Sequence, residues 1–306
     1  MKIPHPIPYQ GSKRHIAKYI LPFFPQEINT LIEPFAGSAA LSIAAACYGK
    51  APQFHLNDLN QPLTALWHEM VNAPKSIANG YKRLWDKQQG QERAFYDEVR
   101  QQFNQTKRPE YLLYLLARCV KASVRYNAKG EFNQSPDNRR LGRHPEQMAE
   151  DIFAVSNLLR GRVIITSQDY TELLRAATTR DLVYMDPPYQ GVGSSGDPRY
   201  FSGVGFGEFV QALRDLTRRH IPFMVSYDGR TGEKSYGQML PADLGLQRVE
   251  VKAGRSTQST LLGGHDITYE SLYLSKELTR DLTSAPQEMV ERLTFLRPQQ
   301  LELSPN

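Results

Sequence analysis

The tetrapeptide Asp186-Pro187-Pro188-Tyr189 directly follows a short apolar stretch, residues 182–185, that is typical of a buried strand. Open α/β sheets bind ligands at the carboxyl ends of their strands, so chemistry is expected at this position. The prolines have no N–H group and hold φ at about −65°, which lets the Asp186 carboxylate and the Pro187 carbonyl face one small group together. Two such acceptors suit an amino group whose lone pair is delocalised into a ring, and Tyr189 could stack on that ring. The alternative is an ordinary Pro-Pro turn capped by Asp186.

A second chemical signal is the glycine-containing turn Pro34-Phe35-Ala36-Gly37-Ser38. It connects a predicted strand, residues 28–33, with an alanine-rich predicted helix, residues 39–47, as in the opening βα unit of a doubly wound sheet. Gly37 lets the backbone approach a ligand without an intervening Cβ. Asp58 follows the next predicted strand about twenty residues later, the customary place for a ribose-binding acid in such folds. The alternatives are a helix-entry glycine without a ligand and an Asx turn at Asp58.

The elements that would position these residues form an α/β pattern. Further strands are predicted at residues 53–56, 163–166, 182–185 and 223–226, with closing strands at 248–251 and 271–274. From Pro62 to about Ala154 the strand signals nearly vanish, and Tyr111 to Arg125 carry apolar residues at helical spacing. We therefore expect one large α/β domain from residues 1–61 and 155–285, an inserted helical domain at 62–154, and a C-terminal tail at 286–306 that contains a final helix.

The distribution of charge indicates a polyanionic partner. The chain has 306 residues and a net charge of +5, and its pI is about 9.1. One segment contains only Glu131 and Asp137 as acids among the basic residues Arg118, Lys121, Arg125, Lys129, Arg139, Arg140 and Arg143. We expect Arg118, Lys121 and Arg125 to share one helix face along a phosphate backbone, with a solvated basic face as the alternative.

Composition argues against several classes of protein. The longest small and apolar stretch, Ala36 to Cys47, is too short to cross a bilayer, so we expect a cytoplasmic protein without membrane contact. The two cysteines, Cys47 and Cys119, fit buried free thiols better than a disulfide framework. The seven histidines show no metal-ligand spacing and suggest no Ser/His/Asp set, so we expect no metal site.

In the order of its motifs the sequence resembles the Dam-like, or D12, class of DNA adenine-N6 methyltransferases. The resemblance extends from Pro8 to about Glu277. It rests on the segments Tyr9-Gln10-Gly11-Ser12-Lys13, Glu33 to Ser38, Asp58, Arg125 to Asn133 and the Asp186 tetrapeptide. It implies a Rossmann-like S-adenosylmethionine-dependent methyltransferase sheet with an inserted helical DNA-recognition domain. It also implies site-specific transfer of a methyl group from S-adenosylmethionine to N6 of a flipped adenine in duplex DNA.

The resemblance assigns the cofactor site residue by residue. Tyr9 would pack on S-adenosylmethionine, Lys13 would meet its carboxylate, and Asp58 would accept hydrogen bonds from its ribose. Asp169 would lie near the cofactor adenine, and Asp186 would orient the target amine while Tyr189 stacks on the flipped base. The expected cofactor-binding residues are Tyr9, Lys13, Pro34, Phe35, Ala36, Gly37, Ser38, Asp58, Asp169 and Asp186, and the expected catalytic residues are Asp186, Pro187, Pro188 and Tyr189.

The same resemblance places DNA contacts in the helical insertion. Tyr126 to Gly130 resembles the family's loop that enters the duplex, and Lys129 could donate to O6 and N7 of a guanine. We expect the glycine-rich segment 190–206 to be a flap over the substrate, and 253–268 to contact phosphates, with a surface hairpin as the alternative. The expected DNA-binding residues are Arg118, Lys121, Arg125, Tyr126, Asn127, Lys129, Arg139, Arg140 and Arg255.

Two other hypotheses stay open beside adenine methylation of duplex DNA. The same chemistry could act on RNA. It could also act on a cytosine or on a glutamine amide, but sites for those substrates usually begin with Ser and Asn respectively, whereas this chain has Asp186. A non-catalytic nucleic-acid-binding protein would predict a decayed catalytic loop, and that loop is intact. For the leading hypothesis we expect double-stranded DNA as partner, a monomer associated with the nucleoid, and a restriction-modification or solitary bacterial or phage methylation system. A cognate endonuclease would then be a functional partner.

Overall fold

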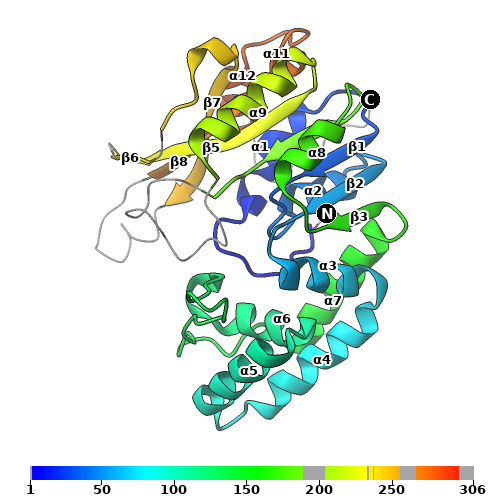
Figure 1. Cartoon of the computed structure of the whole chain (residues 1–306), viewed down its shortest axis with the longest axis vertical. Coiled ribbons are helices and arrows are strands. Elements are labelled where there is room, and N and C mark those ends of the chain that lie inside the picture. Colours follow the sequence, from blue (N-terminus) through cyan, green and yellow to red (C-terminus); the bar gives the residue numbers. More distant parts are fainter. Residues whose placement is uncertain (1, 189–203, 233, 237, 256–266, 296–306) are drawn as a thin grey trace.

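The computed structural model describes residues 2–188, 204–232, 234–236, 238–255 and 267–295. A single sheet forms the centre of the molecule (Figure 1), with its strands in the order β3-β2-β1-β4-β5-β8-β7 and β6 paired with the end of β5. The strands are β1 (Thr30–Glu33), β2 (Gln53–Asn57), β3 (Val163–Thr166), β4 (Leu182–Met185), β5 (Phe223–Thr231), β6 (Lys234–Tyr236), β7 (Gln247–Arg255) and β8 (Ile267–Leu274).

The pairing of the strands divides the sheet into two parts. Strands β3, β2, β1, β4 and β5 are parallel. Strand β8 runs antiparallel to both β5 and β7. This arrangement confirms the expected α/β, Rossmann-like fold and the expected closing pair of strands. The short strand β6 was not predicted from the sequence.

Both faces of the parallel strands are buried, because successive side chains alternate between two hydrophobic clusters. In β1, Leu31 packs into one cluster and Ile32 into the other; in β4, Tyr184 and Val183 do the same. One face is covered by α2 (Ala40–Cys47) together with the short N-terminal elements η1 (Lys13–His15), α1 (Ala17–Ile20) and η2 (Leu21–Phe23). The other face is covered by α8 (Tyr170–Ala176), α9 (Phe206–Arg218) and η4 (Ala242–Leu244).

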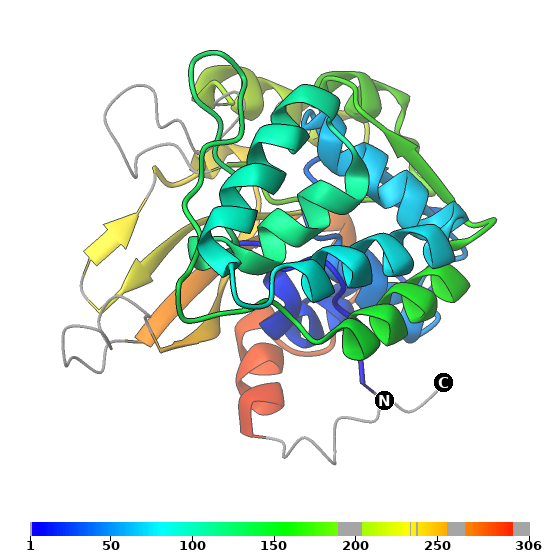
Figure 2. The ribbon, with the colours of Figure 1, turned by 90° about the horizontal axis from the view of Figure 1, so that it is seen from below.

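A group of helices follows β2 and precedes β3, and it forms the lower part of the molecule in Figure 1. Figure 2 shows the same helices from below, where they pack against one another. They are α3 (Gln61–Asn72), α4 (Pro74–Lys87), α5 (Glu92–Thr106), α6 (Pro109–Arg118) and α7 (Pro145–Leu159). Helix α7 contacts α2, and α3 contacts β3, so these two helices connect the helical segment to the sheet layer. The expected boundary after residue 154 falls inside α7.

The expectation of one basic helix face through Arg118, Lys121 and Arg125 is wrong. Helix α6 ends at Arg118 because Cys119 is extended, with φ −77° and ψ 159°. Lys121 then has φ 58°, in the left-handed region, within the short helix η3 (Val120–Ala122). Arg118 itself is only 2% exposed, and its guanidinium donates to the carbonyl oxygen of Glu92. The three side chains therefore do not lie along one face, and Arg118 supports the helical packing.

The last described helices close the sheet at the β7 edge. The short helix α11 (Lys276–Thr279) follows β8, and α12 (Pro286–Phe295) packs against β7. Val290 of α12 is buried in the larger cluster. The side chain of Gln287 accepts a hydrogen bond from the Glu250 backbone N–H at 2.9 Å. A final helix in the tail is thus confirmed.

The described part of the chain offers neither a membrane-spanning helix nor a cluster of metal ligands. No helix among those residues combines the length and apolar character that a bilayer crossing requires. No group of three or more His, Cys, Asp or Glu side chains in the same ranges could hold a metal ion.

Candidate functional site

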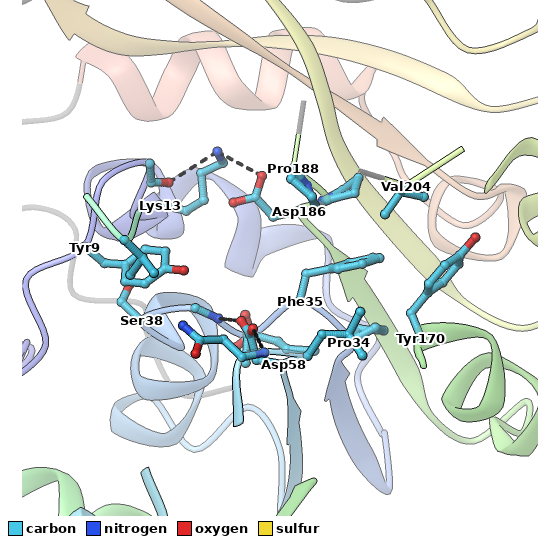
Figure 3. A pocket seen from close by; sticks show the side chains of 18 of the residues that line it. Tyr9, Lys13, Pro34, Phe35, Ser38, Asp58, Tyr170, Asp186, Pro188 and Val204 are labelled. Carbon is cyan, nitrogen blue, oxygen red and sulfur yellow. Dashed lines mark hydrogen bonds and ion pairs between the residues drawn. The ribbon is translucent and has the colours of Figure 1, made fainter. Parts of the chain in front are cut away.

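A cavity lies at the carboxyl ends of β1, β2 and β4, where the predicted motifs converge (Figure 3). Lys13 and Asp186 face each other along one wall, and Asp58 lies on the opposite wall. The cavity is lined by Tyr9 to Lys13, Glu33 to Ser38, Asp58 to Asn60, Tyr126, Asp169, Tyr170, Tyr184, Asp186 to Pro188, and Val204, Gly205 and Glu208, among others. All the predicted cofactor-binding residues are therefore brought together.

The turn after β1 has a backbone that few residues other than glycine adopt. Gly37 has φ 49°, and a Cβ added there would lie 3.2 Å from Cε1 of Tyr9. The Gly37 carbonyl accepts a hydrogen bond from Nε1 of Trp67 at 2.8 Å. Ser38 donates to the hydroxyl of Ser12 at 2.8 Å, which ties the turn to the N-terminal loop. A side chain at Gly37 would therefore be strained in its backbone and would force the Tyr9 ring to shift.

Asp58 is held by backbone N–H groups at the end of β2. Its Oδ2 accepts from Gly37 N at 3.0 Å, and its Oδ1 accepts from Asn60 N at 2.9 Å. Burial raises the pKa of Asp58, while the two backbone hydrogen bonds oppose that rise. Each carboxylate oxygen can accept more than one hydrogen bond, so Asp58 keeps acceptor capacity for a pair of hydroxyl groups.

Asn57, next to Asp58, joins the ends of three strands. Its Nδ2 donates to the carbonyl oxygens of Pro34 and Gln168, each at 3.0 Å. Its Oδ1 accepts from Gln168 N and from the Thr166 hydroxyl, each at 2.8 Å. This fully bonded, buried amide fixes the positions of the turns after β1, β2 and β3, and hence the spacing of the residues that line the cavity.

An aromatic wall closes the end of the cavity that lies away from Tyr9 (Figure 3). The rings of Phe35 and Tyr170 have centroids 5.2 Å apart, and Phe209 supports both from behind. Asp169 is exposed at the cavity and caps α8, because its Oδ1 accepts from Thr171 N at 2.9 Å. Sequence reasoning identified Asp169 but missed Tyr170, which has no motif signal beyond its place directly after the predicted acid.

The wall that carries Lys13 and Asp186 contains a cluster of charged groups. Nζ of Lys13 lies 3.0 Å from Oδ1 of Asp186 and 3.1 Å from Oε2 of Glu270. Burial raises the pKa of Asp186 to about 6; the Lys13 ammonium opposes this rise, and the Glu270 carboxylate adds to it. Sequence reasoning missed Glu270, because it belongs to β8 and no local pattern connects it with the other motifs.

Glu33, at the end of β1, is a second buried carboxyl group at the cavity. Its Oε1 accepts a hydrogen bond from Ser42 N at 2.8 Å, near the start of α2. Burial raises the pKa of Glu33 to about 7, and the neighbouring Asp186 carboxylate contributes to the rise. The Glu33 carboxyl group therefore takes up a proton more readily than an ordinary glutamate.

Tyr126 was predicted to contact DNA, but the structure places it at the cavity. Its ring is buried and its hydroxyl donates to Oδ1 of Asn60 at 3.0 Å. It stands at the base of a hairpin, residues 125–133, in which Tyr126 pairs with Phe132. Helix α5 holds this base, because Asn104 bonds both the N–H and the carbonyl of Phe132. The exposed face of the hairpin therefore does not include Tyr126.

The tip of the 125–133 hairpin carries the other predicted residues. Oδ1 of Asn127 accepts from the N–H groups of Lys129 and Glu131, at 2.9 Å and 3.0 Å, so this amide shapes the turn. The side chains of Lys121, Arg125, Lys129, Arg139 and Arg140 are exposed, and Arg140 lies 3.3 Å from a carboxylate oxygen of Asp137. Tyr189, most of the predicted flap 190–206 and residues 256–266 lie outside the described residues, as does the side chain of Arg255.

The donor and acceptor groups of the cavity fit S-adenosylmethionine. Asp58 supplies acceptors for a pair of ribose hydroxyls, Phe35 and Tyr170 supply an aromatic surface for adenine, and Gly37 leaves its backbone uncovered by a side chain. Lys13 and the carboxylates around it face the other end. The residues present therefore suit a nucleoside joined to a charged tail.

Comparison with known proteins agrees with this geometry. Residues 9–257 match the family model described as D12 class N6 adenine-specific DNA methyltransferase. The chain is 26% identical over 216 residues to a DNA adenine methylase of Vibrio cholerae, covering 69% of this chain and 74% of that protein. It is 26% identical over 273 residues to the Type II methyltransferase M1.LlaDCHI of Lactococcus lactis, covering 83% and 90%.

A further relative is much longer than this chain. The Modification methylase StsI of Streptococcus sanguinis is 28% identical over 193 residues, which are 61% of this chain but only 29% of that protein.

The chain belongs to the D12 class of N6 adenine-specific DNA methyltransferases. Enzymes of this family transfer a methyl group from S-adenosylmethionine to adenine in DNA.

Proposed function

We propose that this protein methylates N6 of an adenine flipped out of duplex DNA within a short recognition sequence. The observation that carries the proposal is the placement of Asp186 and Asp58 on opposite walls of one cavity. Asp186, which would polarise the amino group, and Asp58, which would hold the ribose, thus face the same cavity. S-adenosylmethionine supplies an electrophilic methyl group when it is bound there.

The chain's own residues have separable roles in this proposal. Asp186 in its ionised form accepts a hydrogen bond from the target N6 and, with the Pro187 carbonyl, holds the amine so that its lone pair faces the methyl group. Tyr9 and the Phe35 to Gly37 turn hold the cofactor, and Asp58 binds its ribose. The extra proton on N6 is lost to solvent after transfer. Tyr189 stacks on the flipped base.

The helical segment 62–154 is proposed as the target-recognition domain. Support comes from the exposed basic side chains Lys121, Arg125, Lys129, Arg139 and Arg140, which follow α6 on one continuous piece of chain. Lysine and arginine contact phosphates and guanine edges, and the exposed tip of the 125–133 hairpin presents such groups. We also propose that Arg255 contacts phosphate and that the protein acts as a cytoplasmic, nucleoid-associated monomer, either in a restriction-modification pair with an endonuclease or in a solitary methylation system.

Methyl transfer from labelled S-adenosylmethionine tests the proposal directly. The substrate is DNA from a strain without adenine methylation, and Asp186→Ala is the inactive control. Transfer that requires duplex DNA and yields N6-methyladenine supports the proposal. Transfer to RNA alone would show that RNA, and not DNA, is the substrate. No transfer to either, despite cofactor binding, would favour a non-catalytic nucleic-acid-binding protein.

A further inference from the structure

Glu270 is brought to the catalytic carboxylate by tertiary structure alone. It belongs to β8, whereas Asp186 directly follows β4, and β5 lies between these two strands. Glu270 is paired with Gly229 of β5, next to an irregularity in the register between Ser226 and Gly229. A Cβ at Gly229 would lie 2.7 Å from the carbonyl oxygen of Tyr269, so only glycine allows the two strands to approach this closely. The close pairing of β5 and β8 at Gly229 therefore fixes the position of Glu270.

Glu270 shares one ammonium group with Asp186. Nζ of Lys13 lies 3.0 Å from Asp186 Oδ1 and 3.1 Å from Glu270 Oε2, and the Lys13 side chain is 5% exposed. The lysine ammonium has three N–H donors, so it can serve both carboxylates at the same time. With both carboxylates ionised the three groups carry a net charge of −1, which complements the positive sulfonium of the cofactor.

We propose that Glu270 is a positioning residue for methyl transfer: it holds the Lys13 ammonium between two carboxylates, so that Asp186 is oriented by Lys13 without being neutralised by it. Lys13 contacts Oδ1 of Asp186, and in this proposal Oδ2 accepts from the amino group of the target. This inference rests on the proposed function and concerns how the catalytic carboxylate keeps its strength as an acceptor.

The titratable groups that face Asp186 come from several elements. Among the residues that the structure describes, they are Lys13 of η1, Glu270 of β8, Glu33 of β1 and Tyr184 of β4. Of these, Lys13 lowers the pKa of Asp186, and Glu270 raises it. Removing the negative charge of Glu270 therefore leaves Lys13 to act on Asp186 alone, and the pKa of Asp186 falls.

The test is Glu270→Gln, which keeps the size of the side chain and removes its charge. The single-turnover rate of methyl transfer is measured from pH 5 to pH 9, with saturating S-adenosylmethionine and DNA that lacks adenine methylation. The proposal predicts that the acid limb of the pH–rate profile lies about half a pH unit or more lower in Glu270→Gln than in the unsubstituted protein. It also predicts a plateau rate lowered about tenfold and an affinity for S-adenosylhomocysteine, from calorimetry, within about twofold of the unsubstituted protein.

Glu250→Gln on the adjacent strand β7 is the matched control, because Glu250 pairs with Arg230 instead of Lys13. It should leave the acid limb where it is. An unmoved acid limb in Glu270→Gln would overturn the proposal, and so would a loss of rate that follows a loss of cofactor affinity or of folding. If the unsubstituted protein binds the cofactor but methylates no DNA, the proposed function fails instead.

Discussion

The hydroxyl group of Tyr126 lies 3.0 Å from Oδ1 of Asn60 and donates a hydrogen bond to it. The Asn60 backbone N–H in turn donates to Asp58, whose other oxygen accepts from Gly37 N. A continuous chain of hydrogen bonds therefore runs from the base of the 125–133 hairpin to the turn that would hold the cofactor. Burial raises the pKa of Tyr126, so its hydroxyl stays protonated and remains a donor.

Replacement of Tyr126 by Phe should weaken cofactor binding although the ring stays in place. A buried hydrogen bond contributes about 1 kcal/mol, so we expect S-adenosylhomocysteine affinity to fall about fivefold by calorimetry. Tyr96→Phe is the matched control, since the hydroxyl of Tyr96 donates to the carbonyl of Gln134 at 2.8 Å, within the helical segment. Equal affinities for the Tyr126 and Tyr96 variants would show that the chain of hydrogen bonds does not reach the cofactor.

Gly37→Ala should impair both folding and cofactor binding. Alanine at φ 49° is strained, and its Cβ would press on Tyr9; the backbone strain alone costs about 1 to 2 kcal/mol. Gly49→Ala provides the control, because Gly49 has φ 64° but open space around its Cβ position. We expect both variants to lose stability in denaturant titrations, and only Gly37→Ala to lose cofactor affinity, by about tenfold. Retained affinity in Gly37→Ala would contradict the placement of the cofactor against this turn.

The buried Glu33 should make stability depend on pH. Burial raises its pKa from 4.5 to about 7, so its contribution to stability is fully present below pH 4.5 and is lost as pH rises through about 7. That rise corresponds to at most about 3 kcal/mol. Glu33→Gln, which can still accept from Ser42, should therefore gain stability over the unsubstituted protein between pH 5 and pH 8. If the unfolding free energies of Glu33→Gln and the unsubstituted protein differ by the same amount at pH 5 and at pH 8, this account is refuted.

Lys129 and Arg118 should respond differently to replacement by alanine. Lys129 is exposed at the hairpin tip, so its loss should weaken DNA binding. The slope of log K against log salt concentration should become shallower by about one. Arg118 is buried against Glu92, so its loss should lower the free energy of unfolding by about 2 kcal/mol or more. The checks are fluorescence anisotropy with duplex DNA at several salt concentrations and urea unfolding. Unchanged DNA affinity in Lys129→Ala would remove the hairpin tip from the interface.

The sequence was most informative where apolar runs are bounded by turn residues. Strands β3 and β4 begin and end at the predicted residues, since both are short apolar runs followed by polar or proline-containing turns. The residues at the ends of β1, β2 and β4 also met in one cavity as expected, because parallel strands bring their carboxyl ends to the same edge.

Features that depend on tertiary contacts could not be predicted. The helix through Tyr111 was expected to continue to Arg125, but an isolated bridge between Cys119 and Pro136 holds the chain extended after Arg118. The sequence around Tyr126 predicts an aromatic side chain at the DNA surface, whereas its hydroxyl group bonds to Asn60. Glu270 has no sequence signal at all, because its proximity to Lys13 results from strand pairing across the sheet.

Methylome sequencing tests the central claim most directly. Plasmid DNA is taken from a methylation-deficient host that expresses either this chain or its Asp186→Ala variant, and every modified base is mapped. The account predicts N6-methyladenine at one short sequence motif with the intact protein and none with the variant. Unmodified DNA in both samples, or the same modification in both, would contradict the assignment of Asp186 as the catalytic carboxylate of a DNA adenine methyltransferase.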